Sequence, residues 1–412
     1  MPTPAATPAW APSLSGKRRP DFFKGARQIR IVDLFAGCGG LTLGVAQSAT
    51  KAGFGVDIRL AVDFEQAAVD VYRANFKSAN VVHASVEDYF DGELGAELTE
   101  RERAVRDEVG QVDILVGGPP CQGHSDLNNK TRRNDPKNRL YLRMARAAEV
   151  LKPTVLLIEN VPTVRLDTAG VVKTTYEHLS DLGYDVASAT LSLHALGVAQ
   201  KRRRHVILAT TAEAVDVGAI LTDLAEREAD DAHDLEWAIG DLRDLEAPKG
   251  YDVAPTPSAA NLKRMQYLDD KQELNLPNHL RPKCHQDGNH SYKSMYGRLS
   301  WGEPAQTITS GFGSIGQGRY MHPSELRALT AHEAARIQGF PDYFRFDAIS
   351  KRGDLAVMVG NAVPPALMRE VMTAVLPALR PALTEDEQPA GEATRAAALA
   401  EMPGWAQTPI AS

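Results

Sequence analysis

The sequence predicts an α/β fold in which a mostly parallel sheet carries helices on both faces. Short apolar runs alternate with segments of helical spacing from residue 29 to residue 158, and this alternation is typical of parallel strands joined by helices. Hydrophobic residues make up 43% of the chain and charged residues 24%, which indicates a packed, soluble core. With 412 residues, the chain is long enough for one large domain and a smaller one.

Each element of this fold has its own signal in the sequence. Short aliphatic runs predict strands at residues 29–35, 58–62, 112–116 and 155–158. Residues 184–193 and 205–209 are expected to form a closing pair of strands. Helical spacing of apolar residues marks residues 41–52, 66–76, 140–151, 331–338 and 365–375. Residues 87–110 form a charged insertion that we expect to be helical and exposed.

Composition divides the chain into five parts. Proline, alanine and threonine dominate the beginning, so residues 1–27 are expected to be disordered. The alternating pattern covers residues 28–210 and resumes over residues 327–382. Residues 211–326 lack it and are interpreted as a second, irregular domain, and residues 383–412 are expected to form a loosely ordered tail.

Charge and cysteine content exclude several classes of protein. The net charge of −7 does not favour a nucleic-acid binder, although Lys and Arg cluster locally, as at residues 130–139 and 201–204, and local clusters decide whether a groove neutralises phosphates. The three cysteines stand far apart and the histidines near Cys284 fit no common zinc spacing, so neither a disulfide framework nor a metal is predicted. Neither a membrane-spanning run nor a secretion signal is found, which predicts a cytoplasmic protein without membrane contact.

A glycine-rich turn follows the first predicted strand and opens the first predicted helix, with the sequence Phe35-Ala36-Gly37-Cys38-Gly39-Gly40. Glycines permit a tight turn and a close approach of backbone N–H groups to a ligand, and a helix N-terminus favours an anionic group. The turn alone fits a nucleotide, a flavin, S-adenosylmethionine or a purely structural role. Cys38 is more typical of a small apolar residue than of a reactive thiol.

Acidic and aromatic residues end the second predicted strand, at Asp63-Phe64-Glu65. A carboxylate there can accept hydrogen bonds from ribose hydroxyls, and position does not choose between Asp63 and Glu65. Phe64 suits stacking on an adenine ring. The alternative is that Asp63 is an ordinary helix N-cap.

Three further segments place reactive side chains at strand ends. Cys121 follows Gly117-Gly118-Pro119-Pro120 directly after a predicted strand, a position that favours a nucleophile over a structural cysteine. Glu159 ends the next strand and either carries a proton or forms a structural ion pair. Arg202 and Arg204 would share one face of a strand, where they could bind a phosphate and a base oxygen or form an exposed basic edge.

Together these segments resemble the DNA cytosine-5 methyltransferase family. The order of blocks matches the family: the glycine-rich turn, Pro119-Pro120-Cys121-Gln122, Glu159-Asn160-Val161, Gln200-x-Arg202-x-Arg204, the segment from Arg327 to Pro341, and Gly360-Asn361-Ala362-Val363. The match covers most of the chain outside the tails and residues 211–300. Six blocks in one order are far more specific than any single block.

The resemblance implies a Rossmann-like S-adenosylmethionine-dependent methyltransferase sheet, formed by residues 28–210 and 327–382, and a smaller target-recognition domain at 211–326. Cys121 would attack carbon 6 of a cytosine flipped out of duplex DNA, and Glu159 would hold and protonate ring nitrogen 3. Arg204 would contact the base oxygen O2, supported by Arg202. The methyl group of S-adenosylmethionine would pass to carbon 5, with no metal involved.

The resemblance also implies two sets of binding residues. The cofactor would be held by Phe35, Ala36, Gly37, Cys38, Gly39, Gly40, Asp63, Phe64, Ser85, Val86, Pro119, Leu140, Asn361, Ala362 and Val363. DNA would be contacted by Gln122, Ser125, Arg132, Arg133 and Gln200, and by the second domain. A monomer acting on double-stranded DNA is expected, and a restriction or phage-defence partner is plausible although no residue supports one.

Two residues depart from the family pattern. His124 stands where the family usually has Phe, and Ser85 replaces the usual acidic contact to the adenine amino group. An RNA-directed member is the nearest alternative, but the sizeable second domain favours DNA. A catalytically silent relative would not need Cys121, Glu159 and Arg204 together, and an oxidoreductase would leave the Pro-Cys segment unexplained.

Overall fold

The computed structural model describes residues 14–120, 140–167, 170–230, 232–243, 248–286 and 294–384. Within these residues, seven strands form one sheet in the order β3-β2-β1-β4-β5-β8-β6. Their bounds are β1 Gln28–Leu34, β2 Gly55–Asp63, β3 Val81–His83, β4 Ile114–Gly117, β5 Val155–Asn160, β6 Asp185–Ser192 and β8 Arg203–Thr210. The strands β1 to β5 run parallel, while β8 is antiparallel to both β5 and β6. The predicted α/β sheet and its closing pair of strands are therefore confirmed.

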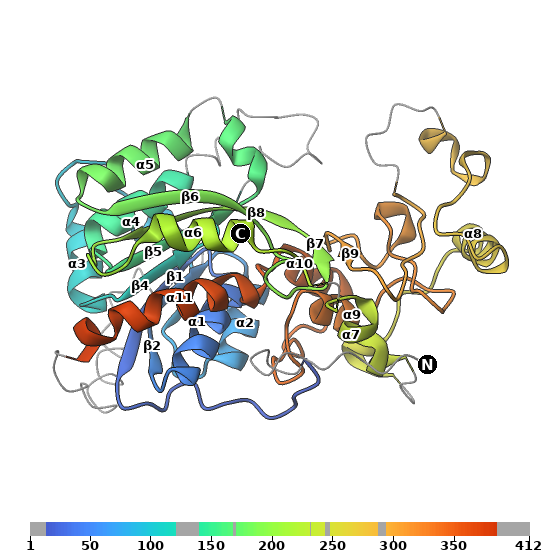
Figure 1. The fold of residues 1–412 in the computed structure, drawn as a ribbon, viewed down its shortest axis with the longest axis horizontal. Coiled ribbons are helices and arrows are strands. Elements are labelled where there is room, and N and C mark those ends of the chain that lie inside the picture. The colour runs from blue at the N-terminus through green and yellow to red at the C-terminus, as the bar shows by residue number, and fades with distance from the viewer. Residues whose placement is uncertain are drawn as a thin grey trace.

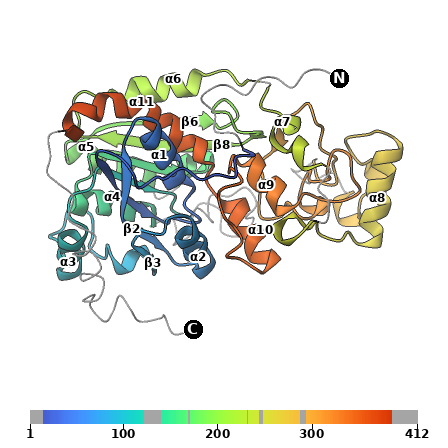
Figure 2. The same cartoon turned by 90° about the horizontal axis from the view of Figure 1, so that it is seen from below.

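Helices cover both faces of this sheet (Figures 1 and 2). Apolar side chains of α1, α2, α6 and α11 form one core with one face, and those of α3, α4 and α5 form a second core with the other. The helices of the first face are α1 Gly40–Lys51, α2 Gln66–Asn75, α6 Val217–Glu226 and α11 Pro365–Thr384, and those of the second are α3 Glu100–Val109, α4 Leu140–Leu151 and α5 Val171–Asp181. The central strands β4 and β5 are buried along their whole length, as parallel strands covered on both faces require.

The charged insertion before β4 is less exposed than the sequence suggests. Its helix α3 begins at a capping box in which the Thr99 hydroxyl accepts from the Glu102 backbone N–H. Glu102 is nonetheless fully buried, because its carboxylate lies 2.6 Å from the guanidinium of Arg146 on α4. The expectation of an exposed insertion is therefore wrong for Glu102.

The beginning of the chain also differs from the prediction. Residues 14–27 were expected to be disordered, but Leu14 and Phe22 are buried in the first core. The Leu14 carbonyl accepts from the Asp342 backbone N–H at 2.8 Å, and the Phe22 carbonyl accepts from Val56 N–H at 2.8 Å. Single apolar residues without periodicity gave no sign of this packing.

The second domain begins later than the predicted residue 211. Val217 and Leu224 of α6 belong to the first core, as do Leu235 and Ile239 of α7 (Leu235–Ile239). Seven buried residues between Met265 and Ala328 form a separate small core around α8 (Ala259–Asp270), which lies far from the sheet in Figure 1. Other buried residues of this range, such as Ile308 and Tyr320, belong to the first core. The helices α9 (Ala331–Ile337), α10 (Arg352–Asn361) and α11 then return to the main body.

Candidate active site

Glu159 and Arg204 meet at one edge of the sheet. Because β8 is antiparallel to β5, the end of β5 lies beside the beginning of β8, and Glu159 pairs with Val206 in register. The Nε atom of Arg204 lies 2.5 Å from Oε1 of Glu159, and the two side chains are 12% and 8% exposed. A nearly buried carboxylate and guanidinium thus share one position at the carboxyl ends of the parallel strands, where ligands bind in α/β sheets.

The Gly-Pro segment after β4 passes directly beside this pair. A Cβ atom at Gly118 would lie 3.1 Å from Oε2 of Glu159, so a larger residue there would press on the carboxylate. The side-chain amide of Asn160 donates to the Pro119 carbonyl at 3.2 Å. The predicted nucleophile Cys121 follows Pro120 in the chain but lies outside the described residues, as do His124 and the predicted DNA contacts Gln122, Ser125, Arg132 and Arg133.

The glycine-rich turn adopts left-handed backbone conformations, with φ of 55° at Phe35, 53° at Gly37 and 90° at Gly39. Asp63 braces it: one carboxylate oxygen accepts from Gly37 N–H at 2.7 Å and the other from Glu65 N–H at 2.9 Å. The N-cap of α2 is Glu65, so Asp63 is not the ordinary N-cap that was the alternative. Phe64 is 53% exposed beside the turn.

Val363 connects the glycine-rich turn to the Gly-Pro segment. A Cβ atom at Gly40 would lie 2.0 Å from the Val363 carbonyl oxygen, and one at Gly118 would lie 3.7 Å from a Val363 methyl group. The segment Asn361-Ala362-Val363 is therefore packed against both ends of the predicted site, although it lies more than two hundred residues further along the chain. Residues from five separate blocks converge at one edge of the sheet.

Comparison with known proteins settles the family. The model of the C-5 cytosine-specific DNA methylase family matches residues 29–376. The chain belongs to this family.

Its relatives include the Type II methyltransferase M1.BsuMI of Bacillus subtilis, 42% identical over 85% of this chain and 81% of the relative. The Type II methyltransferase M1.HphI of Haemophilus parahaemolyticus is 30% identical over 84% of this chain and 86% of its own length. A putative DNA modification methyltransferase encoded within an Escherichia coli prophage has a similar fold, with a TM-score of 0.58, 22% identity, and coverage of 85% and 99% of the two chains. The protein is thus a DNA cytosine-5 methyltransferase, and within the described residues no helix is long and apolar enough to cross a membrane.

In this methyltransferase, Gln200 and Arg202 are buried rather than displayed. The Gln200 amide donates to Gln338 Oε1 at 2.7 Å and accepts from Ile308 N–H at 3.0 Å. Arg202 donates to the carbonyls of Ile308 at 3.1 Å and Gly360 at 3.3 Å. Gln200 is fully buried, so its predicted contact with DNA would require a rearrangement and stays a prediction. Arg202 braces the strand ends beside Arg204.

Residues 200–204 do not form one continuous strand, and the strand expected at 205–209 begins two residues earlier. The two-residue strand β7 (Gln200–Lys201) pairs with β9 (Ala305–Gln306), and β8 begins only at Arg203. Arg202 lies between them with its guanidinium turned inward. Arg204 alone of the two predicted arginines reaches the Glu159 carboxylate.

Three further predicted cofactor residues lie at the short helix η1 (Val86–Asp88) and at the beginning of α4. The Ser85 hydroxyl accepts from Glu87 N–H at 3.3 Å within a capping box that starts η1. Val86 is 2% exposed, and Leu140 is the partly buried first residue of α4. The Ser85 hydroxyl therefore already has a local role in capping.

A buried acidic network beneath the turn was missed. The Thr42 hydroxyl donates to Asp33 Oδ2 at 2.7 Å and the Tyr72 hydroxyl donates to Thr42 Oγ1 at 2.8 Å. Burial raises the pKa of Asp33 to about 8, although the Thr42 hydrogen bond opposes that shift. The available signal was a lone carboxylate within an apolar strand, which must be paired or protonated. Burial also raises the pKa of Cys38 to about 12, and this thiol lies buried within the first core.

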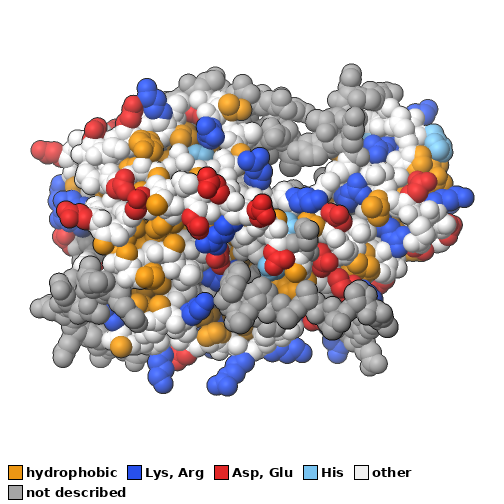
Figure 3. All heavy atoms as spheres, viewed as in Figure 1, with side chains coloured by type: hydrophobic (Ala, Val, Ile, Leu, Met, Phe, Trp, Pro, Cys, Tyr) orange, Lys and Arg blue, Asp and Glu red, His pale blue; other side chains and the backbone are white. Residues whose placement is uncertain are grey.

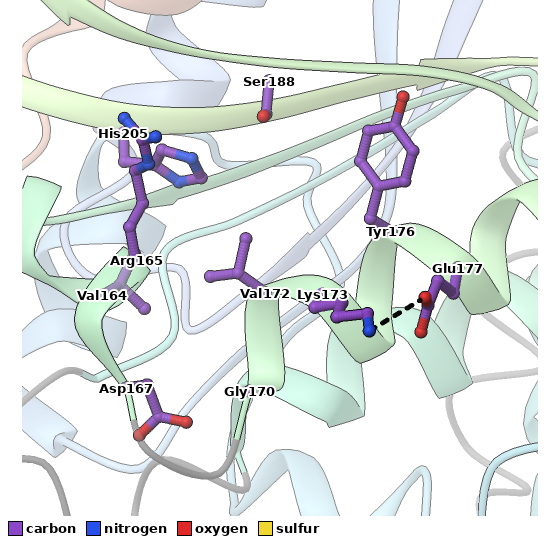
Figure 4. A pocket seen from close by; sticks show the side chains of 10 residues that line it. All are labelled: Val164, Arg165, Asp167, Gly170, Val172, Lys173, Tyr176, Glu177, Ser188 and His205. Atoms are coloured by element: carbon purple, nitrogen blue, oxygen red, sulfur yellow. Dashed lines mark ion pairs between the residues drawn. The ribbon is translucent and has the colours of Figure 1, made fainter.

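A separate pocket of about 450 Å³ lies beside α5, and Figure 4 shows its lining, with Arg165 next to His205 on one side and Tyr176 on the other. Burial, followed by the charge of Arg165, lowers the pKa of His205 to about 4. Neighbouring residues of a strand face opposite sides, so His205 and Arg204 lie on different faces of the sheet. The pocket is therefore not part of the candidate active site.

Charge on the surface is mixed. Figure 3 shows Lys and Arg side chains interspersed with Asp and Glu over the face that it displays. This agrees with the modest net charge of −7 and indicates that phosphate contacts depend on local basic groups rather than on the field of the whole molecule.

Proposed function

We propose that Cys121, Glu159 and Arg204 carry the methyl transfer to carbon 5 of cytosine. Cys121 thiolate adds to carbon 6, forming a carbon–sulfur bond, while Glu159 holds ring nitrogen 3 and carries the proton that draws electrons from carbon 6. Arg204 contacts the base oxygen O2 and keeps Glu159 in place. After carbon 5 is methylated, it loses its proton and the carbon–sulfur bond breaks, which restores the aromatic ring and the thiolate.

The observation that carries this proposal is the 2.5 Å contact between Arg204 and Glu159 beside Gly118, three residues before Cys121. Removal of either partner would leave a charged group uncompensated in a nearly buried position. The pair lies at the edge where Pro119 and Val363 also lie, so an extruded base at that edge would contact Glu159 and Arg204 together.

Methyltransferases of this family use S-adenosylmethionine, and the turn fits it. A Cβ atom at Gly37 would touch nothing within 4 Å, so open space lies beside a left-handed backbone. The first turn of α1 holds no acidic residue, which suits a carboxylate at a helix N-terminus. When bound, S-adenosylmethionine supplies an electrophilic methyl group.

We assign the holding of the cofactor to this chain's own groups. The turn from Phe35 to Gly40 would bind the amino-acid part, the exposed Phe64 would stack on adenine, and Asp63 would reach the ribose. Ser85, Val86, Pro119, Leu140 and the segment from Asn361 to Val363 would complete the pocket. Because Asp63 already accepts two backbone N–H bonds, its ribose contact would use remaining lone pairs.

The substrate is DNA, and we propose that one chain binds the duplex between its main body and the second domain. Extruding the base costs a few kcal/mol, which phosphate contacts by Arg132 and Arg133 would offset. Contacts to base edges from the second domain would select the sequence. Relatives named Type II methyltransferases support a setting in restriction and modification, with the chain acting as a monomer.

Covalent trapping tests the proposal. Duplex DNA carrying 5-fluorocytosine should form an adduct with the protein that resists denaturation, because fluorine cannot leave carbon 5 as the proton does. An active protein that forms no adduct would contradict the role of Cys121. Bisulfite sequencing of DNA from cells that express the protein would then identify the target sequence, and methylation of RNA but not DNA would contradict the substrate.

A further inference from the structure

The segment from Leu14 to Gly25, which we call the strap, crosses three parts of the main body. The Gly16 carbonyl accepts from Tyr343 N–H at 3.0 Å, next to the Leu14 contact with Asp342. The Arg19 guanidinium donates to the Asn75 carbonyl at 2.7 Å, at the end of α2. Phe22 then joins the beginning of β2 through its carbonyl. The strap thus ties the loop after α9 to α2 and β2.

The same loop and helix are joined a second time, from inside. The buried side chain of Asn75 donates to the Arg345 carbonyl at 2.8 Å and accepts from Arg345 N–H at 2.8 Å. Asn75 therefore pairs with one residue of the loop, while its own carbonyl is held by Arg19 of the strap. Docking of the returning segment on α2 depends on both contacts.

Aromatic rings carry the docking to the glycine-rich turn. The Phe22 ring lies 6.5 Å from the Phe76 ring and 6.2 Å from the Tyr343 ring. Phe76 packs at 4.9 Å against Tyr72, and both rings would lie within 3.0 Å of a Cβ atom at Gly39. The Phe22 ring therefore packs against Phe76, one of the two rings on which Gly39 of the turn lies.

The opposite side of the turn is held by the returning segment itself. The Val363 carbonyl and the Phe340 ring would lie 2.0 Å and 3.3 Å from a Cβ atom at Gly40. Phe340 contacts Phe344 at 4.9 Å, and Phe344 contacts Phe76 at 6.4 Å. The turn thus lies between the α2 side, with Tyr72 and Phe76, and the returning segment, with Phe340 and Val363. The strap contacts both sides.

From these contacts we propose that the strap is a positioning element of the cofactor pocket: it holds the returning segment at the distance from α2 that the glycine-rich turn requires. The inference rests on the proposed binding of S-adenosylmethionine at that turn. The strap touches neither the Glu159–Arg204 pair nor the second domain in any contact described above, so it acts on cofactor affinity rather than on the chemical step or on DNA.

Two strap variants test this. Phe22→Ala removes the ring contacts and should raise the KM and Kd for S-adenosylmethionine about tenfold, since residues along a packed network modulate coupling by that order. Arg19→Met removes one hydrogen bond without opening the core and should raise them about threefold. For both, kcat at saturating cofactor and the Kd for duplex DNA should stay within about twofold of the wild type.

Matched controls separate positioning from loss of stability. Phe22→Leu keeps an apolar side chain and should restore most of the cofactor affinity. Leu179→Ala opens the second core, in α5, where Leu179 is fully buried, and should lower stability without raising the KM for the cofactor. An unchanged KM in both strap variants, or an equal rise in Leu179→Ala, would overturn the strap proposal alone. A wild-type protein that does not bind S-adenosylmethionine would overturn the proposed function and the strap proposal with it.

Discussion

The main body and the second domain are built in different ways. The main body has a seven-stranded sheet with an apolar core on each face, as far as the described residues go. The second domain has a small core of its own around α8, and arginines that donate to carbonyls also hold it, such as Arg298 to Pro323 at 2.7 Å and Arg319 to Leu274 at 2.8 Å. Most of the buried apolar side chains thus belong to the main body, and the region around α8 has few of its own.

The largest expected effect is the loss of methylation, through the main body, while DNA binding, through the second domain, is kept. Cys121→Ser should reduce methylation to background, because a serine hydroxyl is a far weaker nucleophile than a thiolate. Binding to duplex DNA should persist, since the second domain is unchanged. Methyl incorporation and a gel-shift titration check the two halves of this prediction, and turnover near the wild-type rate would remove Cys121 from the mechanism.

Glu159→Gln should come next. The amide cannot carry a proton to ring nitrogen 3, so we expect the rate to fall about 10²–10⁴-fold, as for loss of a general acid. The Kd for S-adenosylmethionine should not change, because Glu159 is not part of the proposed cofactor pocket. Single-turnover rates and calorimetric titration measure these quantities, and a near-normal rate would leave the proton-carrying role unsupported.

A pair of leucines compares the two cores directly. Leu268 in the second domain and Leu157 in the sheet are both fully buried, and each change to Ala should cost about 2–5 kcal/mol. In Leu268→Ala we expect this cost to weaken DNA binding while cofactor binding remains. In Leu157→Ala both should be lost together. Titrations of each variant with the cofactor and with duplex DNA would measure the two affinities. Equal losses of both affinities in the two variants would mean that the two regions unfold as one.

The smallest effect concerns Asp33. Its folded-state pKa is raised to about 8, so between its ordinary pKa and about pH 8 the unfolded chain binds fewer protons than the folded one. Stability should therefore fall as the pH rises through this window. Asp33→Asn carries no proton to lose and should be more stable than the wild type at pH 8, with the difference shrinking toward pH 4. Urea unfolding midpoints of both proteins between pH 4 and pH 8 measure this difference in stability. The same pH dependence in both proteins would contradict the raised pKa of Asp33.

The sequence predicted those parts of the molecule that repeat a pattern. Aliphatic runs identified the parallel strands β1, β2, β4 and β5 but not the three-residue strand β3. The strand-end motifs predicted that Glu159 and Arg204 would meet at one edge, and they do. Pattern reasoning failed where single residues decide. Examples are Phe22, in a segment rich in Lys and Arg, and Arg202, whose guanidinium turns inward to reach carbonyls far along the chain. It also placed α6 in the second domain, because acidic residues after Leu221 masked its apolar face.

The inward-facing Arg202 and Gln200 suggest where recognition modules can be exchanged. Their partners Ile308, Gln338 and Gly360 all follow residue 305. A hybrid that takes residues 258–296 from a relative would leave each of these bonds intact, and so could acquire a new target without rebuilding its reaction centre. A junction placed beyond Ile308 would instead take the hydrogen-bond partners of Gln200 and Arg202 from the relative, so that the exchanged segment would also have to hold the strand ends beside the reaction centre.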